Sequence, residues 1–295
     1  MSKTWSIVVA YFPNAQKINA LVARLLAQET DVIVYDNGGA HEAVERQENV
    51  YVIGKGQNKG IATALNESVA FAVLKGAEYV ATFDQDSDPP DGMIPTLRRR
   101  LLQHKNEGVV AVGPVCYDVR NGHFTWPVFS PSRYGFKRIS PDHQKDPIPS
   151  VFLITSGMVF SIEGYQNVGR FDDNLFIDHV DTAWGLRANA MGKTLLTCPE
   201  ARMKHELSRS APRFFLGRLV LDYPPIRRYY TARNSIRLAM SSFTPLGLRV
   251  YFGATTFYRL LALPLFDASP GRCFFAILTG IRDGLSQGAI KPNKT

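Results

Sequence analysis

Two carboxylates one residue apart follow an apolar run that has the character of a buried strand. Asp84 and Asp86, with Gln85 between them and Ser87 behind, come directly after residues 78–83. Mg²⁺ and Mn²⁺ prefer oxygen ligands, and proteins often hold them with one or two carboxylates together with the phosphates of a substrate. Asp-X-Asp pairs are also common in solvated turns, so the neighbouring motifs decide what this tetrad does.

Further polar motifs fall where a strand is expected to end or a helix to begin. Asp36 follows the second apolar run, where an Asp can accept a hydrogen bond from a base or ribose, or can serve a plain Asx-Gly turn. Asn58, Lys59 and Gly60 precede a helical pattern that contains Asn66. The N-terminus of a helix suits a phosphate, and a simple capping cluster is the alternative.

An acidic motif, Phe176-Ile-Asp-His-Val-Asp181, precedes another helical pattern. Acidic residues at a helix start often only complement the helix dipole, but an Asp near a metal-bound phosphate can act as a general base. His205 follows later in the chain. A single His is more often a packed or surface residue, yet it would complete a metal site with the Asp pair if the chain folds back.

The elements expected to position these residues alternate between strand and helix over the first 115 residues. We predict strands at 5–10, 32–35, 50–53, 79–83 and 109–115, and helices at 15–28, 60–75 and 92–105. Asp91 is a candidate cap for the third helix. This alternation predicts an α/β fold with a mostly parallel sheet and helices on both faces, whose ligands bind beyond the carboxyl ends of the strands.

The remainder of the chain is less regular. We predict an irregular excursion at 117–149, strands at 151–154, 158–162 and 194–197, and a helix at 180–191. From Arg213 onward, aromatic and apolar residues alternate with arginines, which predicts several amphipathic helices. We expect a domain at 1–210, divided into a nucleotide-binding half (1–115) and a less regular half (116–210), and a basic helical region at 211–295.

The net charge of +8 is unevenly distributed. Residues 201–295 carry 15 of the 34 Lys and Arg residues but only 4 of the 26 Asp and Glu residues. This excess suits an anionic partner, such as a phosphate-bearing substrate, an acidic membrane surface or a nucleic acid. The chain has no apolar stretch of the roughly 18 residues that a spanning helix needs.

We expect the basic region to lie on a membrane surface, and a helical lid packed on the sheet domain is the alternative. The arginines expected to face anionic lipid are Arg249, Arg259, Arg272 and Arg282. The side chains expected to enter the interface are Phe252, Phe257, Leu260, Leu261, Phe274 and Phe275.

Several functional classes are disfavoured. Three scattered cysteines indicate a reducing compartment without a disulfide framework, and the early first strand leaves no room for a signal peptide. No Gly-X-Gly-X-X-Gly follows the first strand, where Tyr11-Phe12-Pro13 stands, which argues against a nucleotide-dependent oxidoreductase. A nucleic-acid or nucleotide binder without catalytic activity is the alternative from another class, but no nucleic-acid motif is present.

Taken together and in order, the motifs resemble those of the family 2 glycosyltransferases with the GT-A fold, in particular the bacterial rhamnosyltransferase branch. The resembling segments are Val8–Pro13, Asp36–Gly39, Asn58–Gly60, Asn66, Asp84–Ser87, Ser156–Gly157, Phe176–Asp181, Trp184, Leu186–Arg187, Gly192, His205 and Arg228–Asn234. Val180 and Ala183 depart from the family pattern, because relatives often have acidic residues there. Ser208 also departs, where relatives often have Gly.

The resemblance implies an inverting, metal-dependent enzyme that moves L-rhamnose from dTDP-L-rhamnose to a growing surface polysaccharide such as an O-antigen or capsule. Asp181 would be the base, and Asp86 and His205 would bind Mg²⁺ or Mn²⁺. The implied donor-binding residues are Tyr11, Pro13, Asp36, Asn58, Lys59, Gly60, Asn66, Asp84 and Gln85. The implied acceptor-side residues are Ser156, Gly157, Asp178, Trp184 and Arg187.

The partners implied are a dTDP-sugar donor and a glycan acceptor linked to a polyprenyl diphosphate. We therefore expect a cytoplasmic protein held peripherally on the inner face of the cytoplasmic membrane, and no nucleic-acid partner. A UDP-sugar or furanose donor is the alternative with the same fold and mechanism.

Overall fold

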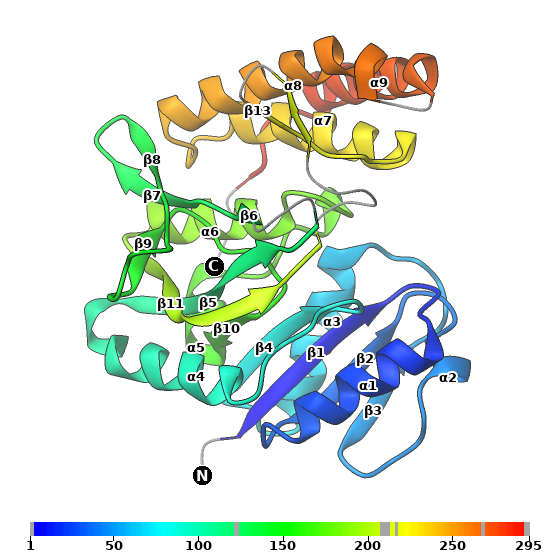
Figure 1. The fold of residues 1–295 in the computed structure, drawn as a ribbon, viewed down its shortest axis with the longest axis vertical. Coiled ribbons are helices and arrows are strands. Elements are labelled where there is room, and N and C mark those ends of the chain that lie inside the picture. Colours follow the sequence, from blue (N-terminus) through cyan, green and yellow to red (C-terminus); the bar gives the residue numbers. More distant parts are fainter. Residues whose placement is uncertain (1–2, 121–123, 207–212, 216–217, 267–268, 292–295) are drawn as a thin grey trace.

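A mixed β-sheet forms the centre of the molecule (Figure 1). The computed structural model describes residues 3–120, 124–206, 213–215, 218–266 and 269–291. In spatial order the strands are β3 (Val50–Gly54), β2 (Asp31–Asp36), β1 (Thr4–Ala10), β4 (Tyr79–Asp84), β10 (Met158–Ser161), β5 (Val109–Asp118), β11 (Thr194–Lys204) and β9 (Ile148–Ser150), and β6 (Phe124–Thr125) pairs with β5. The first four are parallel, whereas β10 runs antiparallel to β4 and β5.

Helices cover both faces of this sheet, so the predicted α/β architecture is confirmed. On one face lie α1 (Ala15–Leu26) and α4 (Met93–Gln103), and on the other lie α3 (Ile61–Leu74), α5 (Ile162–Val168) and α6 (Val180–Ala190). The buried residues of α1 are Ile18, Leu21, Val22 and Leu25. This spacing puts them on one stripe of the helix, which is why the helix packs on the sheet. The short elements are α2 (Ala40–Ala43), η1 (Lys105–Glu107) and η2 (Asp173–Leu175).

Several local predictions are wrong. The segment 117–149 is not irregular, because it forms β6, the hairpin of β7 (Val128–Ser132) and β8 (Gly135–Ile139), and most of β9. Residues 151–154 are not a strand, and they bury Val151 and Leu153 as irregular chain. Helix α5 was not predicted, and α4 begins after Gly92 without a side-chain cap from Asp91.

Three C-terminal helices form a layer over the α6 side of the molecule (Figure 1). They are α7 (Pro225–Met240), α8 (Leu246–Phe266) and α9 (Pro270–Gln287), preceded by the small hairpin of β12 (Arg213–Phe215) and β13 (Arg218–Val220). Residues of this layer, including Leu238, Leu248 and Phe252, share one hydrophobic cluster with α3, α5 and α6. The layer is therefore part of the core, as the lid alternative expects. The domain boundaries stay a prediction.

Helix α9 packs directly on the backbone of α7. A Cβ at Gly284 would come within 2.8 Å of the Arg233 carbonyl oxygen, and one at Gly280 would collide with the Tyr229 carbonyl. Glycine at both positions allows this close approach. Removing α9 would therefore uncover a face of α7.

Most arginines of α7 point inward rather than to solvent. Arg228, Arg233 and Arg237 are 5%, 7% and 6% exposed. The prediction that four arginines face lipid is wrong in part: Arg249 donates to the carbonyls of Ser241 and Thr244, between α7 and α8, and Arg259 is half-buried. Arg272 and Arg282 are exposed, whereas Phe252 is buried. None of the helices in the described ranges has the length and apolar character of a membrane span.

Candidate active site

The carboxyl ends of several strands meet at one edge of the sheet, and the predicted site residues follow them. Asp36 ends β2, Asp84 ends β4, and His205 comes directly after β11. Strand β10 runs in the opposite direction, so the turn 155–157 before it lies at this same edge, beside the end of β4. The topology thus brings together motifs that are up to 170 residues apart in the sequence.

Asp84 lies close to both residues predicted to bind a metal, Asp86 and His205. His205 Nε2 is 3.8 Å from Asp84 Oδ2, which is too long for a hydrogen bond, and His205 Nδ1 is buried without a partner. Burial raises the pKa of Asp84 and the Asp86 carboxylate adds to the increase, whereas His205 and Arg227 oppose it. Asp84 nevertheless keeps 37% of its side chain exposed, so it stays open to a ligand.

This donor set fits a divalent cation that also binds a substrate. Within the described residues, no group of three or more His, Cys, Asp and Glu side chains is arranged to hold a metal ion. Carboxylate oxygens with one unpartnered imidazole would therefore need further oxygen ligands. Phosphates of a nucleotide are the usual source of such ligands.

Hydrogen bonds connect the turn 155–157 to the end of β4 and to the tetrad Asp84–Ser87. The hydroxyl oxygens of Ser87 and Ser156 are 2.5 Å apart and buried, and Gly157 N donates to Thr82 O at 2.7 Å. Gly157 has a φ of +85°, and a Cβ there would come within 2.7 Å of a proline ring in β5. The predicted acceptor residues Ser156 and Gly157 therefore shape the turn, and Ser156 is only 1% exposed.

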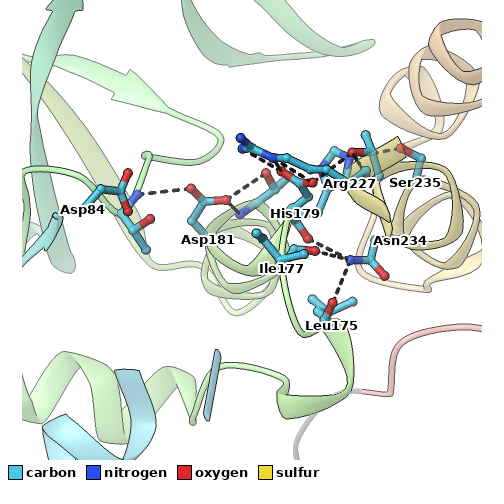
Figure 2. A network of polar contacts seen from close by, with 12 residues as sticks. Asp84, Leu175, Ile177, His179, Asp181, Arg227, Asn234 and Ser235 are labelled. Carbon is cyan, nitrogen blue, oxygen red and sulfur yellow. Dashed lines mark hydrogen bonds and ion pairs between the residues drawn. The ribbon is translucent and has the colours of Figure 1, made fainter. Parts of the chain in front are cut away.

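Asp181 lies in the first turn of α6, next to Asp84 (Figure 2). Its Oδ2 accepts a hydrogen bond from Thr155 N at 3.1 Å, and its Oδ1 accepts one from Thr182 N at 2.6 Å. Burial raises the pKa of Asp181 to about 6, and the negative charge of Asp84 adds to the increase, while these hydrogen bonds oppose it. A carboxylate whose pKa lies near neutrality is suited to take a proton from a hydroxyl group.

Two exposed aromatic residues stand at the end of β1. Tyr11 and Phe12 are 50% and 72% exposed, and their rings meet edge to face. The Gln85 side chain holds this loop, because its Oε1 accepts from Tyr11 N at 2.7 Å and its Nε2 donates to Tyr11 O at 3.2 Å. The Tyr11 ring lies against Gly38. An open aromatic face beside the Asp36 turn is suited to stack on a base.

Asp36 shapes the neighbouring turn with its carboxylate. It is 2% exposed, its Oδ1 accepts from the backbone N–H groups of Gly38 and Ala40 at 2.9 Å, and its Oδ2 accepts from His41 N at 3.3 Å. The sequence predicted that Asp36 contacts a base or ribose. Here both carboxylate oxygens already have backbone donors, so Asp36 acts mainly by holding the turn.

Asn58, Lys59 and Gly60 join this turn to the acidic motif. Asn58 Oδ1 accepts from Gly60 N at 3.0 Å, and Lys59 Nζ pairs with Glu67 at 2.9 Å. Gly60 has a φ of +84°, and a Cβ there would come within 2.6 Å of Phe176 O. Only glycine permits this approach. The close contact at Gly60 therefore determines how near the acidic motif lies to the start of α3.

Three predicted contact residues lie beneath the site rather than in it. Asn66 is 2% exposed, and its amide binds the backbone of Phe171. The Trp184 indole and the Arg187 guanidinium both donate to the carbonyl of Gly169, and both side chains are buried. Asn66 is too buried for the predicted donor contact, which is corrected. Trp184 and Arg187 support the segment that leads to the acidic motif, and their role in shaping the acceptor side stays a prediction.

Asp178 is paired with residues that no sequence motif assigned to the site. Its carboxylate accepts from Arg227 Nε at 3.0 and 3.2 Å and from Thr231 Oγ1 at 3.0 Å. The Arg227 guanidinium lies 4.1 Å from the centre of the Tyr223 ring. The family resemblance of the segment Arg228–Asn234 pointed to this part of the chain. Only the helical spacing of residues 227, 231, 234 and 235 could have shown which side chains face the acidic motif.

Comparison with known proteins identifies the family. The family model for glycosyl transferase family 2 matches residues 6–166. The dTDP-rhamnosyl transferase RfbF of Shigella flexneri is 32% identical over 253 aligned residues, and the match covers 84% of this chain and 84% of that protein.

Solved structures share the fold. TarS 1–349 of S. aureus has a TM-score of 0.55 at 14% identity, covering 96% of this chain and 80% of that one. GalNAc-T7 with UDP, GalNAc and Mn²⁺ has a TM-score of 0.56 at 11% identity. The match covers 97% of this chain and 55% of that one. The chain has the GT-A fold of these structures, and the family match and the rhamnosyl transferase relative show that it belongs to glycosyl transferase family 2.

Proposed function

We propose that the protein transfers L-rhamnose from dTDP-L-rhamnose, with inversion, to a hydroxyl group of a growing lipid-linked bacterial surface glycan. The single observation that carries the chemistry is the position of Asp181, whose carboxylate lies beside Asp84 and accepts a hydrogen bond from Thr155 N. The choice of donor rests on the 32% identity to a dTDP-rhamnosyl transferase over most of both chains.

The donor binds along the carboxyl ends of β1, β2 and β4. Tyr11 stacks on the thymine base, Pro13 and Asp36 shape the loops around it, and the segment Asn58–Gly60 flanks the ribose. Asp84, held open at the end of β4, contacts the ribose or the sugar. The exposed rings at β1 and the Gln85 contacts to Tyr11 support this arrangement.

Asp86 and His205 would hold a divalent cation, Mg²⁺ or Mn²⁺, together with the donor diphosphate. When bound, the cation supplies Lewis-acid stabilisation of the departing nucleoside diphosphate. His205 Nε2 faces Asp84 at 3.8 Å, which is too long for a hydrogen bond, so this nitrogen is the one that could bind the cation.

Asp181 takes the proton of the acceptor hydroxyl, which is a poor nucleophile until a carboxylate accepts that proton. The alkoxide oxygen attacks the anomeric carbon as the bond to the diphosphate breaks, so a single displacement inverts that carbon. Thr155 N keeps the Asp181 carboxylate aimed at the acceptor. Asp178, paired with Arg227, forms the acceptor side of the site.

Donor binding tests the proposal. We expect dTDP-L-rhamnose to raise the melting temperature in the presence of Mn²⁺, because a ligand that binds only the folded state stabilises it. The same screen includes dTDP-D-glucose, UDP-GlcNAc and a UDP-furanose, each with and without EDTA. A larger shift with a UDP-sugar would contradict the donor assignment, and no shift with any nucleotide-sugar would contradict the whole proposal.

We further propose that the outer helices rest on the inner face of the cytoplasmic membrane. Large apolar side chains are exposed on α8 and α9, namely Leu246, Val250, Phe257, Leu261, Phe274, Phe275, Leu278 and Leu285. The exposed Arg272 and Arg282 accompany them. Apolar side chains with cations beside them favour the interface of an anionic bilayer, where a polyprenyl-linked acceptor would also be found.

The triple variant Phe257→Ser, Leu261→Ser, Phe275→Ser is expected to lose at least about 10-fold in affinity for phosphatidylglycerol vesicles, because three apolar side chains no longer leave water. Vesicle co-sedimentation measures this. Leu74→Ser is the matched control, since Leu74 is 84% exposed on α3. Equal vesicle binding by the triple variant and the wild type would show that this surface does not contact lipid.

A further inference from the structure

The loop that leads into α6 has a backbone conformation that most residues avoid. Phe176, Asp178 and His179 have φ values of 64°, 61° and 62°. In this left-handed region the Cβ of an L-residue crowds the following carbonyl oxygen, so only glycine adopts it freely. Such a loop keeps its shape only when its surroundings hold it. Asp181 follows two residues later and moves with it.

One buried amide holds the carbonyl groups of this loop (Figure 2). Asn234 Nδ2 donates to the carbonyl oxygens of Leu175, Ile177 and Asp178 at 3.0, 2.9 and 2.8 Å. Asn234 is fully buried, and its Oδ1 accepts from Arg233 Nε at 3.0 Å. Its two amide protons are therefore shared among three acceptors, and the side chain has no free group that faces a substrate.

Other side chains on the same face of α7 bind the same loop. Thr231 Oγ1 donates to the Asp178 carboxylate, and Ser235 Oγ is 3.0 Å from His179 Nε2. Residues 227, 231, 234 and 235 recur at the spacing that puts side chains on one side of a helix. His179 is the N-cap residue of α6, and its carbonyl accepts from Ala183 N at 2.9 Å. Helix α7 thus reaches the start of α6 directly.

We propose that α7 positions the catalytic base, with Asn234 as its principal contact. The inference rests on the proposed role of Asp181. The carboxylate of Asp181 is held on the sheet side by Thr155 N, and its backbone is held on the other side by the loop that Asn234 fixes. Asn234 is a positioning residue, because it acts on the reaction only through this loop.

Three single variants test the proposal. Asn234→Leu keeps a similar volume but removes the amide, and Ser235→Ala removes only the contact to His179. Ser241→Ala is the control, because Ser241 is fully buried at the end of α7 and its hydroxyl binds Arg237 O and Ile290 N instead of the loop. Transfer from dTDP-L-rhamnose to a panel of octyl glycosides gives kcat and the donor KM, and hydrogen exchange reports on residues 174–183.

Asn234→Leu is expected to lower kcat roughly 100-fold, the effect of displacing a catalytic group by about 1 Å, with an unchanged donor KM. Exchange in 174–183 should rise in this variant. Ser235→Ala should show a smaller change of the same kind, and it decides the matter if Asn234→Leu does not fold. Ser241→Ala should lower the melting temperature while kcat and exchange in 174–183 stay at wild-type values.

Two outcomes would overturn the proposal. The first is that Ser241→Ala and the loop-contact variants lose the same melting temperature and also lose kcat to the same extent. In that case α7 would only stabilise the fold and would not position the base. The other is unchanged exchange in 174–183 in the loop-contact variants. Full activity of Asp181→Asn would instead refute the base, and the exchange result would still decide whether α7 controls the loop.

Discussion

Asp181→Asn is expected to lower the transfer rate by at least about 100-fold while donor affinity stays nearly unchanged. The amide cannot accept the acceptor proton, but it keeps the size of the carboxylate and leaves the donor-binding edge of the sheet intact. Transfer kinetics with dTDP-L-rhamnose and calorimetric titration with dTDP measure the two quantities. Asp91→Asn is the control, because Asp91 is an exposed carboxylate with no part in the proposed mechanism.

The pH dependence of the wild-type enzyme gives a second measure of the same residue. Burial raises the pKa of Asp181 to about 6, so its carboxyl group is protonated below that pH and cannot act as a base. We expect kcat/KM to rise as the pH increases through about 6 and to level off above it. Full activity in Asp181→Asn, or a profile that stays flat from pH 5 to 8, would refute the assignment.

Asp86→Ala and His205→Ala are each expected to weaken dTDP binding in Mn²⁺ by roughly 10- to 100-fold. Without one of its ligands the cation binds more weakly. The negative charge of the dTDP diphosphate is then no longer neutralised by the cation. In EDTA the variants and the wild type should bind dTDP equally weakly. Calorimetry with and without Mn²⁺ makes the comparison.

Asp88→Ala separates this effect from a general loss of negative charge, because Asp88 lies two residues further on and is paired with Arg24. Its affinity for dTDP should match the wild type. If Asp86→Ala and His205→Ala both bind dTDP in Mn²⁺ as tightly as the wild type, the two residues do not form a metal site.

The strands and helices of residues 1–115 were predictable because their signals are local. Alternating strands and helices imply parallel strands, and parallel strands place Asp36 and Asp84 at a common edge. The direction of β10 was not predictable, since an apolar run looks the same in either direction. The apolar run 151–154 was wrongly predicted as a strand, because an apolar run can also be buried as irregular chain. The neighbouring segment β9 pairs with β11 instead.

The C-terminal layer shows why charge is a poor guide to exposure. Arg233 and Arg237 contribute to the basic excess, yet both are buried, and Arg233 donates to the carbonyls of Asn174 and Leu175. A carbonyl acceptor has no sequence signature, because every residue carries one. For that reason the role of Asn234 became visible only when the fold placed it against the loop.

The separation of Asp181 from α7 along the chain bears on how the enzyme matures during synthesis. The strands that carry Tyr11, Asp36 and Asp84 are close in sequence, and contacts between neighbouring segments form early. Asn234 leaves the ribosome 53 residues after Asp181, and α9, which supports α7, follows later still. A chain that ends before α7 lacks Asn234, so the loop before Asp181 is expected to take its final shape only after the last helices have been made.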